Sequence, residues 1–372
     1  MTLPTYSAAR GAADQIHRHL ERLPSRPGGD KTSWPDADTL AVLIDAAFWT
    51  SLRREEIYTP RISLAFAAPS HVKQAISFAI PLLPSPKDLA KLAAAVERSG
   101  IHLCVFPESG ELQVWGITRQ LPPQSLVIEI IVPGLLVIKL SPGPESGKFL
   151  NVAVLQGDQI KIIDPYASAA PKGSAMDSLL RPELSPDGGT GVNVLLQLAL
   201  STRAHGRGGL LLVVPEDSDS WKKSVVHPIT YEVSPPFPGL ANLIRKGDGV
   251  SRSWEDAMAR AVDGIAGLTA VDGATVITTD YRVLVFGAKI VRRTGSPQVS
   301  EVVVTESVEG GHAVTAEPVQ LGGTRHLAAA QFVHDQRDAI AMVASQDGRF
   351  TVFGWSAEEE KVHAHRIDVL LL

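Results

Sequence analysis

The segment Gly322-Gly323-Thr324-Arg325-His326 combines two glycines with residues suited to binding anions. Glycine lets the backbone approach a ligand closely. A helix starting after the glycines would add free N–H groups and the positive end of its dipole. Arg325 supplies a forked donor for phosphate oxygens, and His326 a group that binds metals or transfers protons. The same residues also fit an ordinary glycine-rich helix start with an exposed arginine.

A second short motif, Asp272-Gly273-Ala274, lies where a helix is expected to give way to a strand. A carboxylate beside a glycine at a strand start can bind Mg²⁺ or orient a ribose hydroxyl. It can equally belong to a turn that ends a helix. Taken together, the two motifs predict a site for phosphate groups where their turns meet.

The elements expected around these motifs form a mixed sheet flanked by helices. An apolar stripe predicts a helix from Val192 that ends at His205, and the run Leu210–Val214 is typical of a buried strand. Ser253, with Asp256 three residues later, indicates the start of another helix, and Thr324 is expected to cap a third. The remaining strands are expected at 274–278, 282–286, 339–345 and 349–355, the last two joined by a hairpin at Asp347-Gly348.

The N-terminal half is expected to be an α+β domain with a mostly antiparallel sheet. Helices are predicted at Leu40–Arg53 and Pro86–Arg98. A stretch from Ser168 to Gly189 is rich in Pro, Gly and Ser and is the expected domain boundary. We therefore predict a first domain at 1–185 and a second at 186–372. Strands are expected at 61–67, 102–106, 112–117, 125–132, 135–140, 149–156 and 159–163.

Composition excludes several classes of protein. The net charge of -5 argues against a large nucleic-acid surface, which needs clustered Lys and Arg. The single cysteine, Cys104, allows no disulfide within the chain and no cysteine-rich zinc site. The longest apolar stretch, 126–140, contains Glu129, Pro133 and Lys139, so no membrane span is expected. With no signal peptide recognised, we expect a cytoplasmic protein.

The order of the motifs resembles the diadenylate cyclase domain, also known from the N-terminal part of DisA. The resemblance spans roughly 192–355 and rests on four segments and on the His205–Leu210 stretch before the buried strand. The N-terminal half resembles the sensor domains called DACNV that are fused to such cyclases. The four segments are Asp272-Gly273-Ala274, Phe286-Gly287-Ala288-Lys289-Ile290, Gly323-Thr324-Arg325-His326 and Asp338–Ser345.

The resemblance implies a nucleotidyltransferase that joins two ATP molecules into cyclic di-AMP, a second messenger, and releases pyrophosphate. It implies Mg²⁺ or Mn²⁺ as cofactor and a homo-oligomer in which two such domains meet face to face. Asp272, Arg325 and His326 would be the catalytic residues, and Asp272 would hold the metal with Asp347 as a further ligand. The ATP-binding residues would be Gly273, Ala274, Ile290, Val291, Gly323, Thr324, Arg325, His326, Leu327 and Ser345.

Two residues depart from the family pattern. Leu327 stands where the family motif usually has a second arginine, and Gln346 stands where active members commonly have glutamate. Losing one charge-assisted hydrogen bond typically costs about 1.5–3 kcal/mol. The alternative function is therefore a weak or inactive member of the family that binds ATP or a cyclic dinucleotide as a sensor. The ligand of the N-terminal domain stays open.

His363 and His365 alternate along an expected strand and so share one face. Two histidines on one face can bind a metal, but an exposed strand edge is the simpler interpretation.

Overall fold

The computed structural model describes residues 5–23, 34–54, 58–143, 149–164, 193–246 and 252–372. It divides into two compact units, Met1–Asp164 with Leu372, and Pro165–Leu371. The expected boundary between residues 185 and 186 lies outside the described residues. In the described part of the chain, every helix falls short of the length and apolar character that a bilayer crossing requires.

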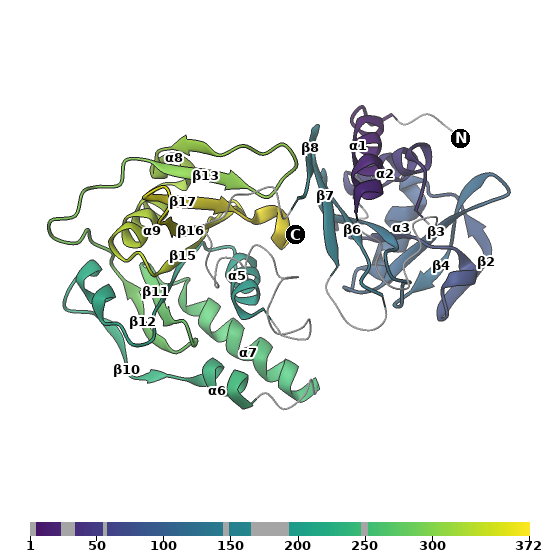
Figure 1. Ribbon diagram of the computed structural model, residues 1–372. Helices are drawn as coiled ribbons and strands as arrows, with labels where there is room; N and C mark the ends of the chain where they lie inside the picture. Colours follow the sequence, from purple (N-terminus) through teal and green to yellow (C-terminus); the bar gives the residue numbers. More distant parts are fainter. Residues whose placement is uncertain (1–4, 24–33, 55–57, 144–148, 165–192, 247–251) are drawn as a thin grey trace. The chain divides into compact units, whose positions relative to one another are not determined.

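The first unit is built on an eight-stranded sheet with the order β2-β4-β3-β1-β5-β6-β7-β8 (Figure 1). β1 and β3 are parallel, with Leu64 opposite Leu103, and the other neighbours are antiparallel. The expected, mostly antiparallel sheet is therefore confirmed. The strands are β1 Ser63–Phe66, β2 Ala75–Leu82, β3 His102–Glu108, β4 Glu111–Thr118, β5 Leu126–Val132, β6 Leu135–Leu140, β7 Leu150–Gln156 and β8 Gln159–Ile162.

Three α-helices of this unit are α1 (Ala9–Arg22), α2 (Ala37–Ser51) and α3 (Pro86–Val96). Side-chain caps begin two of them, because the Asp36 carboxylate accepts the N–H of Thr39 at 2.7 Å and Ser85 accepts the N–H of Asp88 at 3.2 Å. Apolar faces of all three helices pack with inward-facing strand residues into one core.

The second unit is built on a nine-stranded mixed sheet with the order β10-β12-β11-β9-β15-β16-β17-β13-β14. β9 is central and completely buried; it is parallel to β11 and antiparallel to β15. The expected mixed sheet is confirmed. The strands are β9 Gly209–Val214, β10 Tyr231–Phe237, β11 Ala274–Thr278, β12 Val283–Ala288, β13 Val302–Glu306, β14 Val314–Ala316, β15 Ile340–Ala344, β16 Phe350–Ser356 and β17 Lys361–Arg366.

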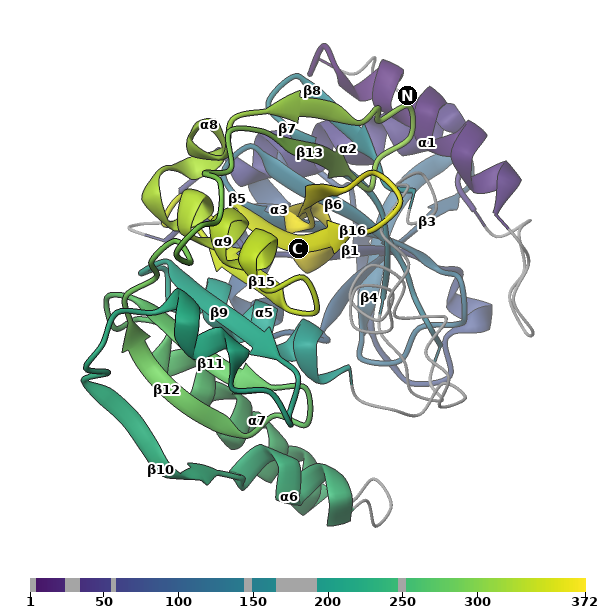
Figure 2. The same ribbon diagram turned by 60° about the vertical axis from the view of Figure 1, so that its left-hand side comes forward.

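Helices cover both faces of the second sheet (Figure 2). α5 (Val194–Ala204) and α7 (Arg252–Leu268) pack on one face, where Met342 and Phe350 belong to their core. α9 (Thr324–Asp335) packs on the other face, against β9, β15, β16 and β17. Shorter helices are α6 (Gly239–Lys246) and α8 (Pro318–Gly322). The sheet is thus enclosed by helices on both faces where β9, β15 and β16 lie.

The start of α9 differs from the expected one. Thr324 is the first helical residue, and Gly323 is the N-cap, with φ of 84° and no side-chain cap bond. A positive φ of this size favours glycine, so the turn between α8 and α9 depends on Gly323. No side chain at the N-cap therefore competes for the N-terminal end of α9.

His363 and His365 share one face of β17 as expected, but the prediction of an exposed edge is wrong. β17 lies between β16 and β13. As whole residues, His363 is 2% exposed and His365 is 1% exposed. Nδ1 of His365 is hydrogen-bonded to the Thr305 hydroxyl, and Nε2 of His363 lies 3.3 Å from a carboxylate oxygen of Glu359. β13 covers this edge, and its strand character was not recognised in the sequence.

Burial of His365 predicts a specific pH dependence. Burial, with the nearby charge of His363, lowers the pKa of His365 to about 3. Because an unfolded histidine titrates near pH 6.5, the unfolded state binds more protons between these values and stability falls as pH falls. We expect His365 to account for about 2 kcal/mol of lost unfolding free energy between pH 7 and pH 5. Urea unfolding of wild type and His365→Gln at both pH values measures this, and an equal loss in both proteins would contradict it.

Candidate functional site

Strand register brings the two sequence motifs to one end of the second sheet. Ala274 at the start of β11 pairs with Leu210 of β9 and with Ala288 at the end of β12. On the other side of β9, Ala344 at the end of β15 pairs with Gly209. The segments just outside these strands, including Asp272, Lys289 and Ser345, therefore emerge at the same end of the sheet.

Gly273 is required by the close approach of two chain segments. Its φ is 116°, and a Cβ added there would lie 2.5 Å from the carbonyl carbon and 2.7 Å from the carbonyl oxygen of Gly287. These are backbone atoms that cannot move aside, so any side chain at 273 would separate β11 from β12. The glycine therefore fixes where the neighbouring Asp272 leaves the sheet, and Ala274 after it is completely buried.

Asp272 carries an exposed carboxylate between two cationic side chains. The side chain is 84% exposed and forms an ion pair with the ammonium group of Lys289. The hydrogen bond and charge of Lys289 lower the pKa of Asp272, and the charge of Arg325 lowers it further. Asp272 and Arg325, whose head lies beside Gly208 just before β9, thus occur at the same end of the sheet, although they belong to motifs far apart in the sequence. The carboxylate is ionised at neutral pH and open to solvent.

The guanidinium of Arg325 lies beside the loop that precedes β9. A Cβ added at Gly208 would be 2.8 Å from Nη1 of Arg325 and 3.1 Å from the carbonyl oxygen of Ala344. Gln346 borders the same space, and its amide donates to the carbonyl of Arg207 at 3.4 Å. The arginine head is therefore held at the N-terminal end of α9, next to an exposed segment that follows β15.

The structure places His326 differently from Arg325. The residue is 1% exposed, its ring lies against Gly322, and it packs edge-on against Phe353 at 5.9 Å between ring centroids. Burial lowers the pKa of His326. A neutral, buried imidazole supports the start of α9 from the core side, whereas Arg325 faces the site. Direct contact of His326 with a ligand therefore stays a prediction that this geometry does not favour.

The other predicted residues divide between this site and its surroundings. Ile290 forms an antiparallel bridge with Val225, and the N–H of Val291 donates to the carbonyl of Ser224 at 3.0 Å. These contacts hold the segment after β12, next to Lys289. Thr324 is exposed and Leu327 half-buried near the start of α9, and Ser345 follows β15.

The residues fit a divalent cation only in part. Asp347 lies in the β15–β16 turn and contacts Nε of Arg349 at 3.4 Å. Across the described ranges, no group of three His, Cys, Asp or Glu side chains is placed to hold a metal ion. Mg²⁺ is commonly bound by one or two carboxylates, with water and substrate phosphates completing its shell. The single carboxylate of Asp272 is sufficient for Mg²⁺ bound in this way. That Asp347 also binds the metal stays a prediction.

Lys289 was not among the predicted site residues, although it lies in the Phe286–Ile290 segment.

We expect Lys289→Met to raise the affinity of the free protein for Mn²⁺ roughly 5-fold, because a cation near the Asp272 carboxylate repels a metal ion. Isothermal titration calorimetry with MnCl₂ measures this, with Lys246→Met as the control for general loss of charge. Equal Mn²⁺ affinities in the two variants would contradict the prediction.

Comparisons with known proteins bear mainly on the first unit. Residues 29–119 match the family model described as "Probable sensor domain DACNV". Residues 29–119 are therefore similar to the DACNV sensor domains. The DACNV match includes α2, β1, β2, α3, β3 and β4, and so lies wholly within the first unit. The resemblance of the N-terminal half to DACNV, read from the sequence, is therefore confirmed over these residues.

A comparison with solved structures gives a match to the crystal structure of a double mutant of DacA from Staphylococcus aureus. The identity is 14%, the match covers 46% of this chain and 83% of that chain, and the TM-score is 0.23. The comparison with curated proteins gave no match. The family-model match thus leaves the second unit uncovered.

Proposed function

We propose that the second unit binds ATP at this end of its sheet and condenses two ATP molecules into cyclic di-AMP with release of pyrophosphate. The observation that carries the proposal is that an exposed Asp272 carboxylate and the Arg325 guanidinium, which lies beside Gly208 just before β9, occur at the same end of the sheet. One group attracts a cation and a hydroxyl, and the other attracts phosphate oxygens.

Each residue has a defined task in this proposal. Arg325, with the backbone at Gly323 and Thr324, binds the triphosphate, and the backbone at Ile290 and Val291 lies beside adenine. Asp272 orients the ribose 3′-hydroxyl, whose oxygen releases its proton to solvent and bonds to the α-phosphorus of the second ATP while pyrophosphate leaves. The same step in the opposite direction forms the second phosphodiester bond and releases the second pyrophosphate. Mg²⁺ or Mn²⁺ bound with the nucleotide would neutralise phosphate charge. Positioning and electrostatic stabilisation supply most of the catalysis in phosphoryl transfer.

The reaction requires two nucleotides and therefore two copies of the chain facing each other, each contributing one site. Sedimentation velocity over a range of concentrations, with and without ATP, tests this requirement. A protein that stays monomeric throughout would contradict the cyclase proposal. The DACNV segment is proposed to regulate the second unit.

The test of the function is incubation of the purified full chain with ATP and either Mg²⁺ or Mn²⁺, with the product identified by mass spectrometry. Cyclic di-AMP and two equivalents of pyrophosphate per molecule of product are expected. Absence of a cyclic dinucleotide from a folded, self-associated sample would refute catalysis by this chain.

A second candidate function is nucleotide binding without turnover. It is favoured by Gln346, which borders Arg325 with a neutral amide, and by Leu327, which adds no cation. Calorimetry with ATP separates the candidates, because tight binding without product supports the sensor. The double substitution Leu327→Arg and Gln346→Glu is then expected to raise turnover if the site is merely weakened.

A further inference from the structure

A hollow of about 700 Å³ opens at the opposite end of the same sheet from Asp272 and Arg325. It is bounded by Val214 at the end of β9, by Ala339 before β15 and by the C-terminal end of α9. Its other walls are two loops, 215–221 and 293–297. The volume is within the range of about 300–1,000 Å³ that is typical of small-molecule sites.

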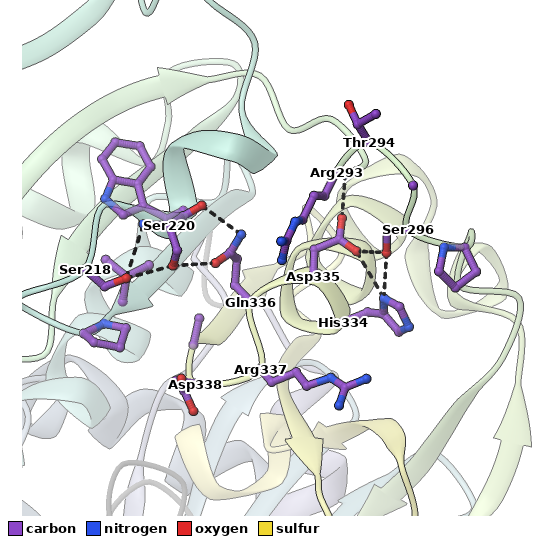
Figure 3. Close-up of a pocket in the computed structure, with 16 residues that line it drawn as sticks. Ser218, Ser220, Arg293, Thr294, Ser296, His334, Asp335, Gln336, Arg337 and Asp338 are labelled. Atoms are coloured by element: carbon purple, nitrogen blue, oxygen red, sulfur yellow. Dashed lines mark hydrogen bonds and ion pairs between the residues drawn. The ribbon is translucent and has the colours of Figure 1, made fainter.

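The loop at 293–297 is fixed in place by a buried carboxylate (Figure 3). The side chain of Asp335 is completely buried and accepts the backbone N–H of Arg293 at 2.8 Å, the hydroxyl of Ser296 and the amide of Gln331 at 3.0 Å. Burial alone would raise the pKa of Asp335, but these hydrogen bonds and one from His334 lower it overall. Asp335 is therefore ionised, and its charge is used within the protein.

Gln336, the next residue, fixes the opposite wall. The side-chain oxygen of Gln336 accepts a hydrogen bond from the Ser220 hydroxyl at 2.8 Å. The side-chain NH₂ group donates to the Ser220 backbone carbonyl at 3.0 Å and to the Ser224 hydroxyl at 2.9 Å. Two adjacent residues at the end of α9 thus hold the two walls apart. Internal hydrogen bonds thus fix both walls of the hollow, as is usual in preformed small-molecule sites.

Two guanidinium groups at the hollow retain unused donors. Arg293 uses only its backbone N–H on Asp335, and its side chain, which has no hydrogen-bond or ion-pair partner within the described ranges, extends between Asp335 and Gln336 (Figure 3). Arg337 stacks over the Trp355 ring at 4.2 Å, which orients the group and leaves its N–H edges free. Asp338 points away from Arg337 in the same view, and no ion pair joins the two within the described ranges.

We propose that this hollow is a second ligand site, which binds a small phosphorylated molecule with its phosphate group at the Arg293 guanidinium. A forked guanidinium donor binds phosphate oxygens in pairs, whereas Arg337 lies apart from Arg293 at another part of the wall (Figure 3). The volume exceeds that of a phosphate group alone and accommodates an attached sugar or nucleoside. The site is independent of the proposed cyclase function, because it shares no residue with the Asp272 end of the sheet.

The test uses inorganic pyrophosphate as the probe and isothermal titration calorimetry on the full chain. All proteins carry Arg325→Met, which removes the guanidinium of the first site, so that remaining binding reports on the hollow. We expect pyrophosphate to bind this background protein and Arg293→Met to weaken the binding about 10-fold or more. Arg292→Met is the matched control, since Arg292 is the exposed neighbour that does not line the hollow, and its effect is expected to stay within about 2-fold.

Several results would overturn the proposal. These are an absence of binding at millimolar pyrophosphate, an unchanged affinity in Arg293→Met, an equal loss in Arg292→Met, or tighter binding of citrate than of pyrophosphate. The last result would identify a carboxylate site instead. Thermal unfolding checks the variants, and Arg293→Lys, which keeps the charge but not the fork, is expected to bind with intermediate affinity.

Discussion

Replacement of Asp272 by asparagine is expected to reduce formation of cyclic di-AMP by about 10²–10³-fold while ATP affinity changes little. The carboxylate is exposed and pairs with Lys289, so its removal leaves no buried charge and the fold is expected to survive. A group that orients the attacking hydroxyl acts mainly in the transition state, and losses of this size are typical when one such electrostatic contact is removed.

The measurement is single-turnover product formation at saturating ATP, with calorimetry to give affinity separately. Lys289→Met provides a comparison in which the same ion pair is broken from its other side. If Asp272→Asn and Lys289→Met had the same modest effect on turnover, the carboxylate would have no special part in the reaction.

Replacement of Arg325 by methionine is expected to weaken ATP binding about 10–150-fold, in an enzyme and in a non-catalytic sensor alike. A charge-assisted hydrogen bond to phosphate contributes about 1.5–3 kcal/mol, and Leu327 offers no second guanidinium to compensate. Methionine retains much of the length of the side chain, so packing near Gly208 is largely kept.

Calorimetry with ATP and with adenosine distinguishes a phosphate contact from a general disturbance. The loss should appear with ATP and be absent with adenosine, which lacks phosphates. Arg292→Met serves as the control for surface charge. Unchanged ATP affinity in Arg325→Met would favour a purely structural role for the second unit.

Most strands could be predicted from the sequence because buried strands appear there as apolar runs bounded by turn residues. β9 is a continuous apolar run inside its sheet, and the turn at Asp347-Gly348 separates β15 from β16 as expected. β2 and β10 were missed for the opposite reason. They lie at sheet edges, are mostly exposed and contain Pro81 or Pro235 and Pro236, residues that argue against a strand.

The candidate site was predictable in its residue types but not in its geometry. The glycines at 273 and 323 adopt positive φ values that only the structure could establish. The ion pair of Asp272 with Lys289 forms beside the pairing of Ala274 with Ala288, and no local pattern reveals this register between β11 and β12. The inward direction of His326 is set by the rotation of α9 against Phe353, a tertiary contact.

The missing side chain at Gly208 supplies the room in which the Arg325 head resides. A methyl group there would displace that head while conserving every formal charge in the protein. Because φ of Gly208 is 70°, alanine there also strains the backbone, so thermal unfolding must accompany the measurement. With the fold retained, Gly208→Ala separates the location of the cation from its mere presence, a distinction that no charge-removing substitution can make. Nucleotide affinity in this variant should fall although its net charge is unaltered.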